Sequence, residues 1–293
     1  MPFLTLFSAP KPFTDPHINI IQRNAIQSWI RLPDTEVFLV GEEDGLAEAA
    51  ADYGVRHLPD VRRNEWGTPL VSSIFDLARR ASNSPLMCYV NGDILLLPAF
   101  VESIRKAADR TPKFLMVGQR WDLDLPQPLD FSAGWDARLW ADAQTRGGLH
   151  APAGSDYFIF PRSLFAGMPD FAIGRAGWDN WMIYHARASR WPLIDATHDL
   201  TVIHQNHDYS HLPGGKAHYD LEETAINAQL GGGMRNMYLT IDATHELVNG
   251  QVRRARPTRV RMLRALERLF YPESETGWRW RLTRRLRHLR RNL

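Results

Sequence analysis

The stretch that decides the fold is LMCYVNGDILLLP, residues 86–98. Its first five residues are all apolar except one tyrosine, as expected of a strand buried on both faces of a sheet. Asn91, Gly92 and Asp93 end that strand, at the place where ligands bind in open α/β sheets. We therefore interpret Asp93 as a candidate ligand of Mg²⁺ or Mn²⁺, which would hold a diphosphate there. An ordinary Asn-Gly-Asp turn is the alternative.

Strands and helices alternate on both sides of this stretch. We predict strands at 3–7, 36–40, 55–58, 86–90 and 114–117, and helices at 18–30, 44–53, 69–81 and 98–109. Residues 120–152 read as a long, partly irregular excursion, followed by a strand at 156–161, a helix at 177–188 and a strand at 200–204. This order predicts an α/β fold with a mostly parallel central sheet and helices on both faces.

Composition places one large domain at 1–250 and an appendage at 251–293. The chain has 293 residues, 44% of them hydrophobic, which is enough for a large core. Its single cysteine, Cys88, excludes an internal disulfide framework and fits a reducing compartment. The opening MPFLTLFSAP lacks the features of a signal peptide, and no apolar run is long enough for a membrane span, so we expect a cytoplasmic protein.

Charge divides unevenly between these two parts. Residues 251–293 hold 14 arginines against three glutamates, which leaves 21 basic and 30 acidic residues for 1–250. Two segments of this tail, 257–270 and 278–293, carry leucines at helical spacing with arginines between them. This pattern predicts amphipathic helices lying on an anionic membrane surface. Docking on a protein or on RNA is the alternative, and the acidic body argues against nucleic acid.

The order of elements, with VNGD after the fourth strand, resembles the A-type (GT-A) fold of nucleotide-sugar glycosyltransferases, bacterial glycosyltransferase-2-like. The resemblance spans roughly residues 3–210. In that family an Asp-X-Asp motif at this place binds the metal and the nucleotide-sugar. Here Asn91 replaces the first aspartate, and only Asp93 matches the second. The resemblance implies donor contacts from Asn91, Gly92 and Asp93, and the departure at Asn91 puts strict metal dependence in doubt.

The segment GRAGWDNWMIYHARA, residues 174–188, looks like the acceptor-side loop of inverting enzymes of that fold. In those enzymes a carboxylate at a helix start acts as base, removing the proton of the acceptor hydroxyl. The resemblance makes Asp179 the candidate base and Trp178 a ring that stacks on a sugar. Asp179 could instead cap its helix, and a helix-dipole position would keep its pKa low.

Three histidines follow a predicted strand in TVIHQNHDYSH: His204, His207 and His211. In the family a histidine in this late region often completes the metal site. We therefore expect His204 or His207 to join Asp93 around the ion, since neutral imidazole suits Mn²⁺. Hydrogen-bonded loop histidines are the alternative. The following HLPGG, residues 211–215, offers backbone N–H groups that could approach a phosphate.

Three further segments are candidate donor contacts. In this fold the end of the first strand touches the nucleotide, which implicates Ser8, Ala9 and Pro10, with Lys11 near phosphate. The segment RRNEWGTP, residues 62–69, precedes the helix under the same pocket. From it we expect Arg63 and Asn64, or Arg62, to reach the base or diphosphate. Asp122 and Asp124 of WDLD are candidate ligands of the donor sugar, and a plain loop is the alternative.

These residues together predict an enzyme that transfers a sugar from a nucleoside diphosphate-sugar, by default a UDP-sugar, to a glycan or glycolipid hydroxyl. The expected placement is peripheral, at the inner face of the membrane, in polysaccharide biosynthesis. One alternative is a nucleotidyltransferase, although FSAPKPF lacks the glycine-rich loop that such enzymes carry after the first strand. A non-catalytic membrane-tethered scaffold of the same fold is the other.

Overall fold

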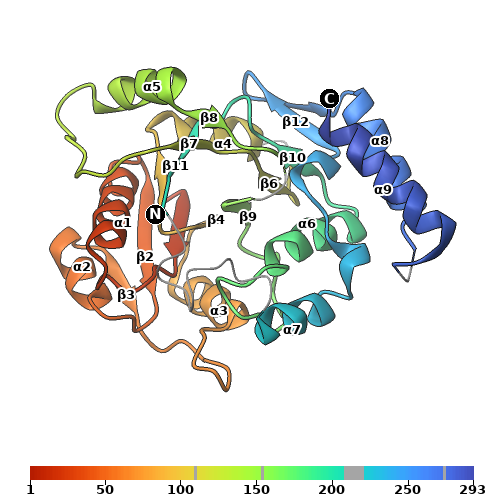
Figure 1. Cartoon of the computed structure of the whole chain (residues 1–293). Helices are drawn as coiled ribbons and strands as arrows, with labels where there is room; N and C mark the ends of the chain where they lie inside the picture. The colour runs from red at the N-terminus through yellow and green to blue at the C-terminus, as the bar shows by residue number, and fades with distance from the viewer. Residues whose placement is uncertain (109–110, 153–154, 208–220, 273–274) are drawn as a thin grey trace.

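The structure is a computed structural model that describes residues 1–108, 111–152, 155–207, 221–272 and 275–293. Its centre is a nine-stranded sheet in the order β13-β12-β10-β6-β9-β4-β1-β2-β3 (Figure 1). Seven of these strands run in one direction, and β9 and β13 run antiparallel to their neighbours. The strands are β1 (Leu4–Ser8), β2 (Thr35–Val40), β3 (Arg56–Leu58), β4 (Leu86–Val90), β6 (Leu115–Val117), β9 (Tyr157–Pro161), β10 (Leu193–Asp195), β12 (His245–Val248) and β13 (Gln251–Arg254).

Helices cover both faces of this sheet, as the alternating pattern predicted. The core on one face takes side chains from α1 (Pro16–Trp29), α2 (Leu46–Tyr53) and α4 (Ala99–Ala108). The core on the other face takes them from α3 (Val71–Ala81) and α6 (Trp178–Ala188). Strand residues alternate between the two cores, since Cys88 packs in the first and Tyr89 in the second. The predicted α/β fold class is therefore confirmed.

A second, four-stranded sheet lies beside the first, in the order β5-β11-β7-β8 (Figure 1). It contains β5 (Ile94–Leu96), β7 (Trp121–Leu123), β8 (Gly148–Leu149) and β11 (Val202–Gln205). With α5 (Trp135–Arg146) it encloses a small core of its own, which includes Leu123, Trp135 and Ile203. The expectation of a partly irregular excursion at 120–152 is confirmed, and its regular part includes α5, in which Leu139 and Ala143 fall on one buried face.

The remaining helices are α7 (Glu222–Leu230), α8 (Arg259–Leu269) and α9 (Gly277–Arg291), with two short 3₁₀ turns at Met234–Asn236 and Thr240–Asp242. Helices α8 and α9 lie together beside α6 and β12 at one end of the molecule (Figure 1). The proposed boundary after residue 250 falls in the turn between β12 and β13, so residues 251–254 complete the central sheet. The candidate His211 and the 211–215 loop lie outside the described residues.

Candidate active site

The small sheet brings the candidate metal ligands together. Strand β5 begins immediately after Asp93 and pairs antiparallel with β11, placing His204 opposite Ile94. On its other side β11 pairs parallel with β7, placing His204 opposite Asp122. The Gln205 side chain fixes the turn further, because its amide donates to the main-chain carbonyls of Ile21 and Asp93. The predicted neighbourhood of Asp93, His204 and His207 is therefore built by strands distant in sequence.

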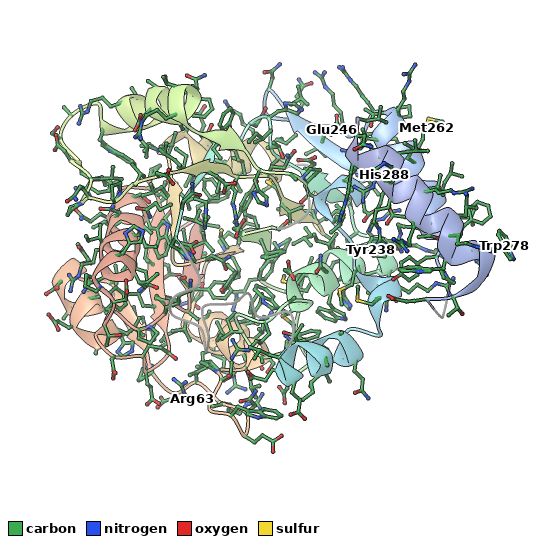
Figure 2. The ribbon with its side chains drawn as sticks, viewed as in Figure 1. Arg63, Tyr238, Glu246, Met262, Trp278 and His288 are labelled. Atoms are coloured by element: carbon green, nitrogen blue, oxygen red, sulfur yellow. The ribbon has the colours of Figure 1, made fainter. Side chains whose placement is uncertain are left out.

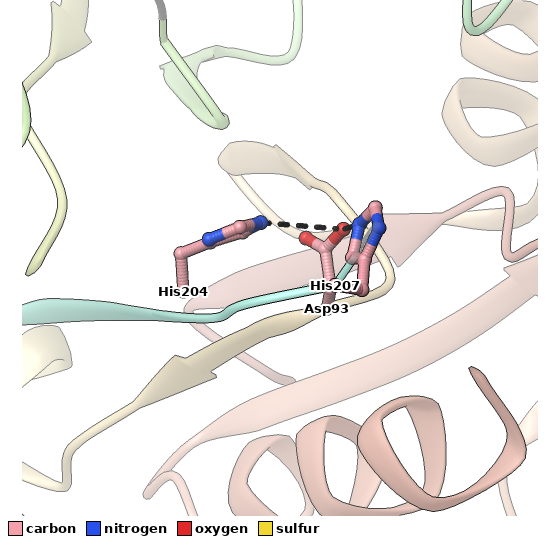
Figure 3. A group of neighbouring side chains, drawn as sticks. All are labelled: Asp93, His204 and His207. Carbon is pink, nitrogen blue, oxygen red and sulfur yellow. Dashed lines mark hydrogen bonds and ion pairs between the residues drawn. The ribbon is translucent and has the colours of Figure 1, made fainter. Parts of the chain in front are cut away.

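Asp93, His204 and His207 form a compact cluster of potential metal ligands (Figure 3). One ligand atom from each lies within 4.8 Å of the other two. Oδ2 of Asp93 is 3.1 Å from Nε2 of His207 and 3.8 Å from Nε2 of His204. These side chains are 13%, 11% and 10% exposed, in sequence order. The other Asp93 oxygen, Oδ1, is buried and accepts no hydrogen bond from the part of the chain that the structure describes.

These three donors fit a divalent cation. Carboxylate oxygen and imidazole nitrogen both suit Mn²⁺, and the unpartnered buried oxygen leaves coordinating capacity unused. Burial by itself would raise the pKa of Asp93, but the neighbouring His204, His207 and Lys11 hold it well below its usual value. Asp93 is therefore a carboxylate throughout the physiological pH range, which is the form that binds a metal ion.

Lys11 extends this cluster toward the first strand. Its Nζ lies 3.2 Å from Nε2 of His207, and burial lowers its pKa against the opposing charge of Asp93. Gln22 holds the loop, accepting from the Lys11 main-chain N–H and donating to its carbonyl. A side chain on Gly92 would come within 3.3 Å of the Pro10 Cα, so the two loops are in close contact. The loop after the first strand therefore lies against the NGD turn, while the predicted approach of Lys11 to a phosphate stays a prediction.

Two of the predicted donor contacts from the first strand face inward. Ser8 is fully buried, and its hydroxyl has no hydrogen-bond partner among the described residues. Pro10 is also buried, whereas Ala9 is partly buried against the core beneath α3 and α6. The structure therefore places this segment at the sheet edge, and its contact with a nucleotide stays a prediction.

Asp122 lies beside His204, in a network that sequence reasoning did not identify. Oδ1 of Asp122 is 3.2 Å from Nδ1 of His204, within the range of an ion pair. Nδ1 of His204 makes no hydrogen bond to any of the described residues. Oδ2 of Asp122 is 2.7 Å from Nδ1 of His150. Although burial lowers the pKa of His204, the carboxylates of Asp122 and Asp93 raise it overall. Asp122 thus contacts a candidate metal ligand, while its predicted contact with the donor sugar stays a prediction.

Arg120 and Asn91 both contact Asp156, a residue that the sequence analysis did not single out. Arg120 lies 2.6 Å from Oδ1 of Asp156 and 2.9 Å from Oδ1 of Asp122. The Asn91 amide donates to the same Asp156 oxygen at 2.9 Å. A second aspartate at position 91 would place two carboxylates in contact there, which is unfavourable. Asp156 reaches this edge because β9 runs antiparallel to β4, a direction that the sequence does not reveal.

Asp179 is the second residue of α6, next to Gly177, whose φ of +114° suits the sharp turn there. Its Oδ1 accepts from the Gly177 N–H at 3.3 Å, so it bonds back to the turn and is not the N-cap residue. The expected low pKa is wrong. Burial raises the pKa of Asp179 and the charge of Asp156 adds to this, against the opposing N–H groups at the helix start.

Three other predicted residues have structural roles. Trp178 is buried among Phe75, Tyr89 and Phe158, so its predicted stacking on a sugar is wrong. Helical spacing puts the ring on the same core-facing side of α6 as Met182. Arg63 lies at the tip of the β3–α3 loop (Figure 2), 2.9 Å from Glu43. Asn64 donates to Glu223 at 2.7 Å. Arg63 and Asn64 thus pair with glutamates of the chain, one in a loop and one in α7, and their contact with a nucleotide stays a prediction.

Comparisons with known proteins give similarity in structure only. No protein-family model matches the chain, and no curated protein matches it. Among solved structures, glucosyl-3-phosphoglycerate synthase from Mycobacterium tuberculosis with Mg²⁺ and uridine diphosphate has 15% identity and a TM-score of 0.42, covering 70% of this chain and 72% of that one. The same enzyme with Mn²⁺, UDP-Glc and phosphoglyceric acid has 15% identity and a TM-score of 0.45, covering 79% and 80%.

A mannosyltransferase from Pyrobaculum calidifontis in complex with GDP-Man and Mn²⁺ has 13% identity and a TM-score of 0.42. It covers 98% of this chain and 68% of that one. These proteins are glycosyltransferases, the class that the sequence resembles. Similarity at this level does not carry their donors or acceptors over to this chain, so the function is argued from the site itself.

Proposed function

We propose that this chain transfers a sugar from a nucleoside diphosphate-sugar to a hydroxyl of a glycan or glycolipid, assisted by Mn²⁺ or Mg²⁺. The observation that carries the proposal is the cluster of Asp93, His204 and His207 outside the carboxyl end of β4, with one buried Asp93 oxygen left unpartnered. That position is where open α/β sheets bind ligands. The proposal takes UDP as the default nucleotide.

In this proposal Asp93, His204 and His207 hold the cation, which would neutralise the diphosphate leaving group when bound. Lys11 adds a positive charge beside the same cluster, 3.2 Å from His207. Asn91 and Arg120 hold Asp156 in place, which keeps a further negative charge near Asp179. The residues at the ends of β1 and β4 would then contact the donor.

Asp179 is proposed as the general base of an inverting transfer. It would accept the proton of the acceptor hydroxyl while that oxygen attacks the anomeric carbon and the bond to the diphosphate breaks. Burial supports this role, because the raised pKa of Asp179 makes its carboxylate a better proton acceptor than an exposed aspartate. The Gly177 N–H, which donates to Oδ1 of Asp179, would help to keep the carboxylate oriented.

We also place the reaction at the inner face of a membrane, on a glycan or lipid-linked acceptor of polysaccharide biosynthesis. The support is the charge of residues 251–293, with 14 arginines against three glutamates. Basic segments of this kind are attracted to anionic lipid surfaces. Among the described residues no helix combines the length and apolar character that a membrane span needs.

The test is calorimetric titration with UDP and GDP, with and without Mn²⁺, of the wild type, Asp93→Asn and a matched surface variant. Asp52→Asn makes the same chemical change on the exposed side of α2, where Asp52 pairs with Arg23. We expect Mn²⁺-dependent binding of one nucleotide that Asp93→Asn abolishes and Asp52→Asn retains. Binding that ignores Mn²⁺ removes the metal role, and no binding to either nucleotide contradicts the transferase.

A further inference from the structure

Helices α8 and α9 bury charged side chains where helices usually bury apolar ones. Glu267 is 1% exposed and lies between three arginines, at 3.2 Å from Arg264, 2.8 Å from Arg287 and 3.0 Å from Arg290. Arg264 also pairs with Asp242 at 2.9 Å. We call these five residues the ionic seam. The fully buried residues of α8 and α9 are thus polar, and the apolar residues of both helices stay at least partly exposed.

The helix pair is attached firmly to the body. Arg261 donates to the main-chain carbonyls of Ile241 and Ala243, and its guanidinium lies 3.1 Å from Glu246 and 3.5 Å from Asp195. Asp195 ends β10, one of the central strands. The pair therefore has a fixed orientation relative to the sheet, and its outer side always faces the same way.

That outer side carries large apolar side chains. Met262, Leu266 and Leu269 follow a spacing of four and three residues, which puts them on one stripe of α8. On and after α9, Trp278, Leu289 and Leu293 are also exposed. We call these six residues the outer face; they are 42–66% exposed. Six of the twelve exposed large hydrophobic residues found among the described residues are these.

Figure 2 places Met262 and Trp278 on the side of the helix pair that points away from the body. Arginines lie among these residues. Arg281 and Arg285 come three and seven positions after Trp278, so they border the same stripe of α9, and both are exposed. Seven more arginines of residues 251–293 are exposed as well: Arg253, Arg254, Arg256, Arg259, Arg279, Arg284 and Arg291.

We propose that the outer face is a docking surface for an anionic lipid bilayer. Apolar side chains would enter the boundary between headgroups and acyl chains while the arginines pair with lipid phosphates. A second copy of the chain would bring two strongly positive surfaces together, which charge repulsion opposes. A nucleic acid would satisfy the arginines but leave the six apolar side chains in water. A bilayer accommodates both the six apolar side chains and the arginines. Both groups lie on the helix pair that the ionic seam holds together.

The surface is independent of the transfer reaction, although it would position the proposed site at a membrane. The test is sedimentation of the full chain with vesicles of phosphatidylcholine alone or mixed with phosphatidylglycerol. We expect binding to the mixed vesicles only, weakened at about 0.5 M NaCl because salt screens surface charge. Binding should also shift the fluorescence of Trp residues to shorter wavelength, and brominated lipids should quench it.

The deciding variants are Leu269→Glu and Trp278→Glu, with Leu230→Glu as the matched control. Leu230 is 41% exposed at the end of α7, so its substitution makes the same chemical change away from the outer face. We expect each outer-face variant to lower the partition coefficient about tenfold, the order expected for one lost apolar contact. Circular dichroism should be unchanged, since these positions are exposed.

Two results would overturn the proposal: no binding of the wild type to anionic vesicles, or loss of binding in Leu230→Glu equal to that in the outer-face variants. Concentration-dependent dimerisation abolished by Trp278→Glu, without vesicle binding, would assign the surface to a second copy. Nucleotide titration of the same preparations separates this test from that of the transferase, because vesicle binding does not require Asp93.

Discussion

The molecule contains two clusters of buried charged side chains that differ in one respect. In the ionic seam, Glu267 uses both carboxylate oxygens, each within 3.2 Å of an arginine nitrogen. In the Asp93 cluster, one carboxylate oxygen faces His207 and the other has no partner among the described residues. In the seam both carboxylate oxygens of Glu267 are paired, whereas the Asp93 cluster keeps one carboxylate oxygen that could bind a cation.

This difference teaches how to separate structural from functional charge. A buried charge that is not fully paired costs free energy of folding. A charge of this kind is therefore expected where it has a function, such as binding a ligand. The seam needs nothing beyond the chain, and it serves to hold α8, α9 and the turn at Asp242 together. The Asp93 cluster lies outside the carboxyl end of β4, where open α/β sheets bind ligands, and is the candidate site for that reason. Four substitutions test the comparison.

The largest effect is expected from Asp93→Asn. The amide cannot replace the carboxylate charge that holds the cation, and that charge stabilisation is worth several kcal/mol in metal enzymes. We expect sugar transfer to fall by about 1,000-fold. Measurement of nucleotide release from a UDP- or GDP-sugar would show it. The lowered pKa of Asp93 means that its charge also contributes some stability, so urea unfolding should show a loss smaller than that expected for Glu267→Gln. A loss as large as that of Glu267→Gln would instead mean that Asp93 is mainly a structural charge.

Glu267→Gln tests the other cluster. It would leave Arg264, Arg287 and Arg290 without their shared counter-charge, at a cost of about 3 kcal/mol in the free energy of unfolding. Urea denaturation measures it, with the exposed Glu275→Gln as the matched control, expected to change stability by less than about 0.5 kcal/mol. Mn²⁺-dependent nucleotide binding should persist, and its loss would show that the two clusters are coupled.

The same variant should change how stability depends on pH. Burial would raise the pKa of Glu267, but Arg287, Arg264 and Arg290 lower it overall below the usual 4.5. A group with a lowered folded-state pKa contributes stability above its unfolded pKa, and this is lost as pH falls through the folded value. The wild type should therefore lose stability below about pH 4.5 more steeply than Glu267→Gln. Equal slopes would contradict the assignment.

Asp179→Asn separates the proposed base from both clusters. Removing a general base costs typically 100-fold or more, so we expect about a 100-fold fall in transfer with donor binding unchanged. In the wild type, transfer should decline as pH falls through the pKa of Asp179, which burial places above the usual aspartate value. A rate profile measured at saturating donor tests this. Full activity of Asp179→Asn would exclude its role as base and favour a retaining mechanism.

The smallest effect is expected from Asn91→Asp. This change restores the two-aspartate motif in sequence, yet here the new carboxylate would face Oδ1 of Asp156 in place of a hydrogen bond. We expect a loss of about 1 kcal/mol in the free energy of unfolding and no gain in Mn²⁺ affinity. Thermal unfolding and Mn²⁺ titration measure the two quantities. Tighter Mn²⁺ binding would show that position 91 can serve as a ligand.

Sequence reasoning predicted much of the fold and part of the site. The apolar run at 86–90 and the alternation around it were enough for the parallel sheet, because uninterrupted apolar strands require cover on both faces. Asp93 was identified because it follows the apolar strand at 86–90, whereas His204 and His207 were identified from the family resemblance and from the three histidines at 204–211. Strands β5, β7, β8, β10, β12 and β13 and helices α5 and α7 were missed, since short or weakly patterned segments give little signal.

The two tail helices show the limit most clearly. Their leucine spacing was correctly interpreted as helical, and residues 259–269 and 277–291 are α-helices. Which face would be buried could not be read from that spacing. Glu267 and Arg264 are buried because partners from α9 and the Asp242 turn meet them there, and such partners are known only once the chain has folded.

By itself, then, the sequence determined the elements whose apolar pattern is strong, the sheet edge that carries the candidate site, and the basic charge of the tail. Tertiary structure alone decided that Trp178 packs in the core, that Asp156 joins the site, and that the tail helices bury a salt-bridge network. Hydrophobic periodicity is local along the chain. The pairing of buried charges depends on groups that are far apart in sequence, and strand pairing and helix packing bring them together.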